Sequence, residues 1–396
     1  MRFFLSALVL SVAAGSASSG TAVPVAVDEV TSGRVAYWRM DSVSGTTTPG
    51  TPGDATLVNG AAAGAGRFNG GISLDGTNDY LEAADHASLN FGTGSFTVAL
   101  WFRATGTASK RLINKWNGPK PQGWLLDVHS GAGGAAQAGY IRFRIDDNPD
   151  GDAASDSLDI ARDADLDLRV NQWTHVAAVV NRSSAPGNVL LYVNGNPVGG
   201  ATNLPSGFGS VSNTFALGIG TIPTSLGKYF AGGVDEVALY NRALTQTEVR
   251  TLIRPLPPED LAASLGGSPG APAVTLTWDA APGADTYDVY RSLDGGTPVQ
   301  IATGLTGTTY TDSSLPVQGN SYTVTYTVRG ANFFQSLDSL PATVTVDPPP
   351  PRTGDHTEGL FDDRCACGSA GPVPGGPFPA LALAAAGLAG LLLGRR

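Results

Sequence analysis

The dominant pattern between Thr31 and Asn241 is an alternation of apolar and polar residues with a period of two. Residues 95–103 place Phe96, Val98, Leu100 and Phe102 on one face, and residues 139–145 place three apolar side chains on one face and two arginines on the other. Further strands are expected at residues 173–180, 189–193, 215–219 and 234–240. A period of two is typical of strands with one buried face. Because Gly-rich turns separate these strands, we expect an all-β fold, an antiparallel two-sheet sandwich.

Two local signals add detail to this sandwich. Asn194-Gly195 follows an expected strand and is typical of a type I′ hairpin turn. Thr245 and Glu248 have the spacing of a capping box, in which each side chain satisfies a backbone N–H of the first helical turn. The apolar stripe Val249, Leu252 and Ile253 follows. We therefore expect one short helix after the last strand.

A second, shorter β module begins after Pro257-Pro258. Its expected strands are residues 274–278, 286–291, 310–312 and 321–328, which span some 90 residues at the spacing of a small sandwich. Tyr322 follows Leu315 closely enough for its hydroxyl to bond back to the preceding backbone, as in a tyrosine corner.

Composition narrows the possible classes of protein. The 396 residues include 52 Gly and 27 Pro with only 15 % charged residues, which excludes a coiled coil. The formal net charge of −10 disfavours nucleic acid and anionic lipid as partners. Cys365 and Cys367 are the only cysteines, so the first 364 residues have no disulfide framework or cysteine-based zinc site.

The two ends of the chain resemble targeting segments. Residues 1–22 combine an apolar run with small residues and are expected to be a secretory signal peptide. Residues 365–396 contain a short Cys motif, an apolar run and the terminal pair Arg395-Arg396, in the order that resembles the MYXO-CTERM signal of myxobacterial surface proteins. The resemblance implies processing near Cys365 and Cys367 by a sorting protease at the membrane. It also implies retention at the bacterial cell surface or outer membrane.

Five blocks of the first module, in order, resemble the laminin-G-like branch of the concanavalin A-like lectin/glucanase superfamily. They are residues 68–81, 96–102, 173–177, 191–195 and 234–244. The resemblance implies a jelly roll, usually a binding module with a calcium ion near the edge of the sandwich. Trp278 and the tyrosines after it resemble a fibronectin type III domain.

These observations predict five segments. They are a signal peptide (1–22), a laminin-G-like jelly roll (23–254), a fibronectin type III-like sandwich (255–347), a Pro-rich acidic tether (348–364) and a sorting signal (365–396).

Carboxylates are the residues with the most chemical interest. Relatives that hydrolyse glucans carry Glu-x-Asp-x-x-Glu on one strand, and none of the six glutamates here has that spacing, so we expect no catalytic residues and no enzyme activity. The resemblance implies a structural Ca²⁺ held by Asp41, Asp54 and Asp235, with Asp75 and Asp79 as alternatives.

A second calcium hypothesis comes from the residues alone. Asp146, Asn148, Asp150, Asp152 and Asp156 supply oxygens at spacings that suit Ca²⁺ around a Gly turn. The alternative is a solvated hairpin in which Asp, Asn and Gly satisfy the turn.

Two tryptophans are candidate ligand-binding residues. Trp116 and Trp124 flank a Pro/Gly loop, where exposed rings would stack on sugars, although large aromatics at sandwich edges are also typical of the core.

The function that these features favour is a surface-anchored, non-catalytic binding or adhesion protein, with an extracellular glycan or surface protein as partner. The alternatives are an accessory subunit of a secreted glycoside hydrolase, and a structural envelope component without a discrete ligand.

Overall fold

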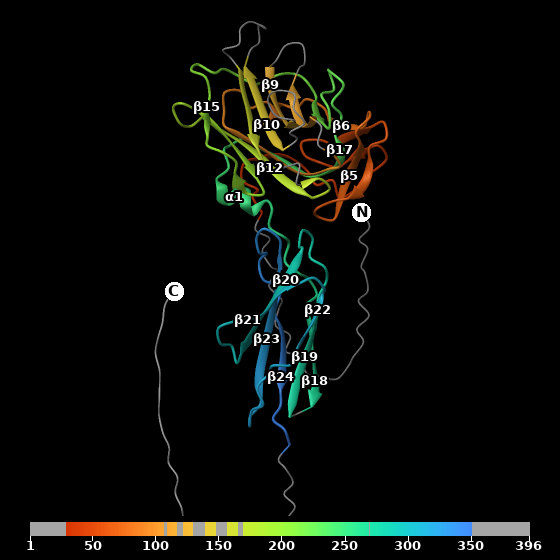
Figure 1. The fold of residues 1–396 in the computed structure, drawn as a ribbon, viewed down its shortest axis with the longest axis vertical. Helices are drawn as coiled ribbons and strands as arrows, with labels where there is room; N and C mark the ends of the chain where they lie inside the picture. Colours follow the sequence, from red (N-terminus) through yellow and green to blue (C-terminus); the bar gives the residue numbers. More distant parts are fainter. Residues whose placement is uncertain are drawn as a thin grey trace, which may run out of the picture. The chain divides into compact units, whose positions relative to one another are not determined.

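The first part of the chain folds into two large antiparallel sheets packed face to face (Figure 1). The computed structural model describes residues 29–106, 109–116, 122–129, 139–147, 157–164, 169–268 and 270–350. The expected all-β class and two-sheet sandwich are confirmed.

One sheet has nine strands. In spatial order they are β14 (Asn196–Pro197), β13 (Asn188–Val193), β12 (Thr174–Asn181), β7 (Phe96–Ala104), β17 (Ala231–Tyr240), β5 (Gly70–Asp75) and β4 (Ala62–Ala65), with β1 (Arg34–Trp38) beside β17 and β15 (Thr202–Asn203) beside β13.

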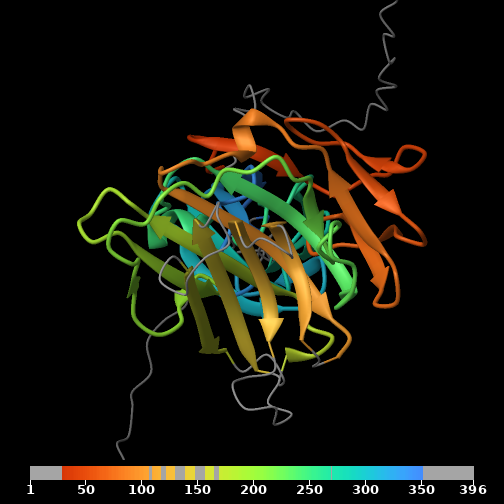
Figure 2. The same cartoon turned by 90° about the horizontal axis from the view of Figure 1, so that it is seen from above.

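The other sheet has eight strands, of which those coloured orange to yellow lie side by side in one layer in Figure 2. Their order is β11 (Ser157–Asp163), β10 (Tyr140–Asp147), β9 (Gln122–His129), β8 (Lys110–Trp116), β16 (Leu217–Ile219), β6 (Tyr80–Ala83), β3 (Ala55–Val58) and β2 (Thr47–Thr48). A 3-10 turn, η1 (Ala87–Leu89), follows β6.

The core between the two sheets is made by the inward residues of the alternating strands. Phe96, Val98, Leu100 and Phe102 of β7 face Ile141, Phe143 and Ile145 of β10 in one apolar cluster. The Asn194-Gly195 turn has positive φ at both residues, 47° and 72°, as a type I′ turn requires. The period-two pattern thus predicted which side chains the sandwich buries.

The helix α1 (Gln246–Thr251) has the expected capping box. Thr245 accepts a hydrogen bond from the N–H of Glu248, and the Glu248 carboxylate accepts one from the N–H of Thr245. Val249 is buried against the outer face of the nine-stranded sheet, with Tyr192 and Tyr240.

The second sandwich also has two sheets, visible in the lower half of Figure 1. They are β18 (Ala262–Ser268), β19 (Ala271–Thr277) and β22 (Thr309–Asp312), and β21 (Val299–Leu305), β20 (Thr286–Leu293), β23 (Tyr322–Ala331) and β24 (Ala342–Val346). The Tyr322 hydroxyl donates to the carbonyl of Pro316 at 2.6 Å, so the expected tyrosine corner is present.

Within the described ranges, no helix has the length and apolar content needed to cross a lipid bilayer. The predictions for residues 1–22 and for Cys365 and Cys367 concern residues outside those ranges.

Candidate functional site

The outer face of the eight-stranded sheet carries a cluster of arginines and aspartates on three neighbouring strands. Across β8, β9 and β10, Asp127 is paired in register with Arg111 on one side and Arg142 on the other. In the next row, Arg144 of β10 lies opposite Asp159 of β11. The alternation that buries Ile141, Phe143 and Ile145 therefore places these charges together on the opposite face.

Asp127 holds the two arginines of its row. Its side chain is 1 % exposed and accepts hydrogen bonds from Arg142 Nε at 3.0 Å and Nη2 at 2.7 Å, and from Arg111 Nη1. Burial lowers the pKa of Arg111, whereas for Arg142 the lowering by burial is outweighed by the Asp127 carboxylate, and its pKa is raised. The carboxylate thus fixes both guanidinium planes at the sheet surface.

Arg144 is held differently. Its guanidinium carbon lies 4.9 Å from the centroid of the Trp116 ring, and its Nη2 is 3.5 Å from Asp146 Oδ2. Arg144 Nε is buried and has no hydrogen-bond partner among the described residues. The Arg144 side chain is 35 % exposed, so its guanidinium lies at the surface of the same face as Arg111 and Arg142.

Two further groups lie at one end of the cluster. Burial and the nearby Arg142 lower the pKa of His129, and its Nδ1 is buried without a hydrogen-bond partner in the described part of the chain. Burial, Arg111 and Arg142 lower the pKa of Lys228. Burial is the largest cause of both pKa shifts, and the arginines add to it.

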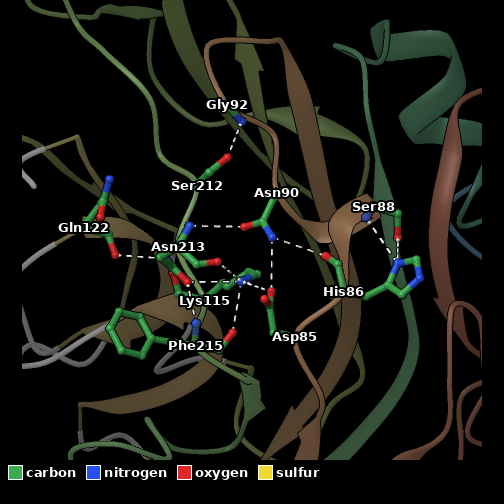
Figure 3. A network of polar contacts seen from close by, with 10 residues as sticks. All are labelled: Asp85, His86, Ser88, Asn90, Gly92, Lys115, Gln122, Ser212, Asn213 and Phe215. Carbon is green, nitrogen blue, oxygen red and sulfur yellow. Dashed lines mark hydrogen bonds and ion pairs between the residues drawn. The ribbon is translucent and has the colours of Figure 1, made fainter.

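A separate polar network supports one edge of this sheet (Figure 3). The Lys115 ammonium, with a side chain 1 % exposed, donates to Asp85 Oδ1 at 2.7 Å, to the Asn213 carbonyl at 2.8 Å and to the Phe215 carbonyl at 2.9 Å. Asn90 links the two loops, because it donates to Asp85 and accepts from the N–H of Asn213. Lys115 therefore joins the segment after β6 to the segment before β16.

The two candidate tryptophans are both buried, which corrects the idea that they form a sugar-stacking platform. Trp124 is 1 % exposed and packs in the core against Phe91 and Phe96. Trp116 is 4 % exposed, and one side of its ring is covered by Arg144. Both tryptophans therefore occupy buried positions, which is the alternative that their place at the sandwich edge also allowed.

The three carboxylates implied as calcium ligands do not come together. No three His, Cys, Asp or Glu side chains among the described residues could hold a metal ion in common. Asp41 accepts from the N–H of Gly70, and Asp54 from the N–H of Gly50. Asp79, one of the alternatives, accepts from the N–H of Gly60. Each carboxylate thus stabilises a different turn.

Asp235 binds three backbone N–H groups. Its Oδ2 accepts from the N–H groups of Arg67 at 2.7 Å and Phe68 at 2.9 Å, and its Oδ1 accepts from the N–H of Glu236. Burial raises its pKa to about 8, although the three N–H donors favour the ionised form. The Asp235 carboxylate therefore fixes the backbone of the segment that contains Arg67 and Phe68.

The second calcium hypothesis stays a prediction. Asp146 lies at the end of β10, with Arg144 beside it, and Asn148, Asp150, Asp152 and Asp156 lie outside the described residues.

Sequence reasoning placed Arg142 and Arg144 on the outer face but missed their partners. Asp127 and Arg111 occupy segments whose alternation is masked by neighbouring apolar residues, and a bulge between Arg111 and Ile113 shifts the register of β8. The outward arginines of β10 were the signal that could have led to the cluster.

Comparison with known proteins agrees with this architecture. Residues 75–250 match the family model of the concanavalin A-like lectin/glucanases superfamily. No curated protein sequence matches the chain.

Three solved structures are among those to which this chain is similar. The binding domain of Paraclostridial Mosquitocidal Protein 1 is 18 % identical over 62 % of this chain, which spans 64 % of that domain, with a TM-score of 0.43. Domain 4 of AbnA, a GH43 extracellular arabinanase from Geobacillus stearothermophilus solved with arabinotriose, is 16 % identical over 55 % of this chain and 97 % of its own, with a TM-score of 0.38. A Fn3-like protein from Clostridium thermocellum is 40 % identical over 22 % of this chain and 90 % of its own, with a TM-score of 0.20.

The family match and the sheet topology lead to the same conclusion. Residues 75–250, within the first sandwich, match the concanavalin A-like lectin/glucanases superfamily, and the sheets of that sandwich have the two-layer antiparallel arrangement expected for it.

Proposed function

We propose that this chain is a non-catalytic binding protein whose lectin domain takes an acidic glycan on the outer face of the eight-stranded sheet. The observation that carries the proposal is the arginine cluster Arg111, Arg142 and Arg144, fixed on that face by Asp127 and Trp116. The match to a lectin family and a surface that carries fixed guanidinium groups together support this proposal.

The ligand is expected to be acidic because of the chemistry of guanidinium. Arginine recognises planar carboxylates through parallel N–H donors, and guanidiniums that are held in place lose little side-chain entropy on binding. The Arg144 side chain is 35 % exposed, and Arg111 donates to Asp127 through Nη1. A uronic acid or another sugar carboxylate supplies the complementary acceptors.

The arrangement favours binding over cleavage. A retaining glycosidase needs two carboxyl groups about 5 Å apart, one of them protonated and free to donate to the glycosidic oxygen. On this face Asp127 binds Arg111 and Arg142, and Asp159 lies 3.5 Å from Arg142 Nη1. Carboxylates that bind guanidinium groups are not free to reach a glycosidic oxygen.

The proposal can be tested on an array of acidic and neutral glycans with the full chain. Arg144→Ala should weaken binding to uronic acid glycans by roughly 10- to 100-fold, because hydrogen bonds to charged groups contribute about 1.5–3 kcal/mol each. Arg329→Ala, which changes an arginine of the second sandwich paired with the half-exposed Asp338, is the matched control and should bind normally. Equal binding to neutral and acidic glycans, or a protein ligand insensitive to Arg144→Ala, would contradict the proposal.

We further propose that the protein is secreted and displayed at the bacterial surface, with the fibronectin type III-like sandwich as a spacer. This rests on residues 1–22 and on the motif around Cys365 and Cys367. Mass spectrometry of the surface-bound protein should show that residues beyond about Cys367 are removed or modified, and an intact chain ending in Arg396 in the medium would argue against display.

A further inference from the structure

A cavity of about 90 Å³ lies on the other side of the lectin domain, on the outer face of the nine-stranded sheet. Part of its floor is formed by Ala99 of β7 and Ala238 of β17, which are directly paired across the two strands. Leu252, Pro255 and Leu256, which follow α1, form part of the wall. The hollow exists because two methyl groups stand where larger side chains would fill the space between sheet and wall.

Two buried polar atoms belong to residues that line this cavity. Trp101 is 0 % exposed and His175 is 2 % exposed, and their rings pack edge to face with centroids 5.4 Å apart. Trp101 Nε1 and His175 Nδ1 have no hydrogen-bond partner among the described residues. An unpaired buried donor or acceptor is costly, and few occur in native proteins.

His175 at this end of the cavity is neutral, and the cation over Trp101, Arg67, whose guanidinium carbon lies 5.3 Å from the ring centroid, is paired with Asp285. Complete burial lowers the pKa of His175 to about 3, so the imidazole carries no charge at neutral pH. The charged groups at the other end have partners of their own. Tyr37 donates to Glu236, and Arg34 lies 3.5 Å from Glu29.

We infer that this cavity is a binding site for a small neutral compound bearing an amide or hydroxyl group. Such a group both accepts and donates, as the Trp101 indole N–H and the His175 nitrogen together require. A charged group would lose its hydration against apolar walls, and the nearby Arg67 cation is already paired with Asp285.

The test uses the indole N–H signals of the ¹⁵N-labelled full chain, which has 6 tryptophans. Acetamide is the neutral probe, and acetate is its charged counterpart of nearly the same shape. Acetamide should move the Trp101 resonance in a saturable way, with half-saturation roughly in the millimolar range for so few atoms. The resonance is assigned by its loss in Trp101→Phe.

Trp278 is an internal control, because its Nε1 is also buried without a partner but it lies in the core of the second sandwich and does not line the cavity. Its resonance should not move. If acetate shifts the Trp101 resonance as much as acetamide does, the inference that the ligand is neutral is wrong. Equal shifts of Trp101 and Trp278, or no shift of Trp101, would overturn the site itself and leave a cavity that holds only water.

Filling the cavity provides a second, independent test. Ala238→Leu should abolish the response of Trp101 to acetamide while the indole signal of Trp124, in the core of the same sandwich, shows that this sandwich remains folded. The smaller substitution Ala99→Val should reduce the response if Ala238→Leu does not fold. A full response in a folded, filled variant would overturn the inference.

Discussion

Arg142 donates a hydrogen bond to each carboxylate oxygen of Asp127, with Nε 3.0 Å from Oδ1 and Nη2 2.7 Å from Oδ2. The same carboxylate accepts from Arg111, so one buried negative charge organises two positive ones. The geometry explains how a chain with a net charge of −10 presents a positively charged row on its lectin domain.

Asp127→Asn should destabilise the lectin domain by about 3 kcal/mol or more, because removing one partner leaves two poorly solvated guanidiniums uncompensated. The measurement is urea denaturation followed by tryptophan fluorescence. Asp338→Asn breaks the Arg329–Asp338 pair, whose aspartate is 43 % exposed, and should cost under about 1 kcal/mol. Equal costs for the two variants would show that burial of Asp127 does not matter.

Lys115→Met should also be severely destabilising, by about 3–5 kcal/mol, although methionine matches the length and apolar stem of lysine. It leaves Asp85 and the carbonyls of Asn213 and Phe215 without their shared donor. The control Lys110→Met, on the same strand at a partly exposed position, should be nearly neutral. Similar unfolding midpoints for both variants would contradict the network's role.

Glu236→Gln should remove part of the pH dependence of stability. Burial raises the pKa of Glu236 from 4.5 to about 7, so the folded state keeps its proton while the unfolded chain loses it. The contribution of Glu236 to stability is therefore full below about pH 4.5 and is lost as the pH rises through 7. Gln stays neutral and still accepts from Tyr37, so relative to the wild type the variant should gain stability between pH 4.5 and 7. A constant difference across this range, measured by urea denaturation, would refute the assignment.

Calcium remains a testable prediction for the segment that contains Asp146. A ligand that binds only the folded state, at 100 times its Kd, adds about 2.7 kcal/mol, which corresponds to roughly 5–11 °C in melting temperature. The shift between calcium and chelator should vanish in Asp146→Asn and persist in Asp41→Asn. Identical melting curves in calcium and in chelator would leave this segment as an ordinary solvated hairpin.

Local signals in the sequence predicted a large part of the fold of this protein. The alternation in residues 95–103 and 139–145 predicted which side chains the sandwich buries, because a strand places every second side chain on the same face. Thr245 with Glu248 predicted a helix start, and Tyr322 predicted a bond to the backbone just upstream. These features depend on residues close together in the chain, so their spacing contains the information.

Tertiary structure alone decided the roles of Asp235 and Glu236. The pairing of β17 with β7 shifts between Asp235 and Ala238, and Glu236 adopts a φ of 51°. Simple alternation from Val234 would put Glu236 in the core, whereas the bulge leaves Val237 in the core and Glu236 beside the outer cavity. The sequence indicated Asp235 as an important carboxylate, but only the fold brings the N–H groups of Arg67 and Phe68 to it.

Tertiary structure also decided the arginine cluster and the cavity. Arg142 and Arg144 were visible as outward residues, yet Asp127 and Arg111 become their neighbours only through the register of three strands. Trp101 and His175 are 74 positions apart in the numbering and meet because β7 pairs with β12. Sequence spacing encodes the period of each strand, whereas contacts between strands depend on register and bulges, which are set by the packing of the whole sandwich.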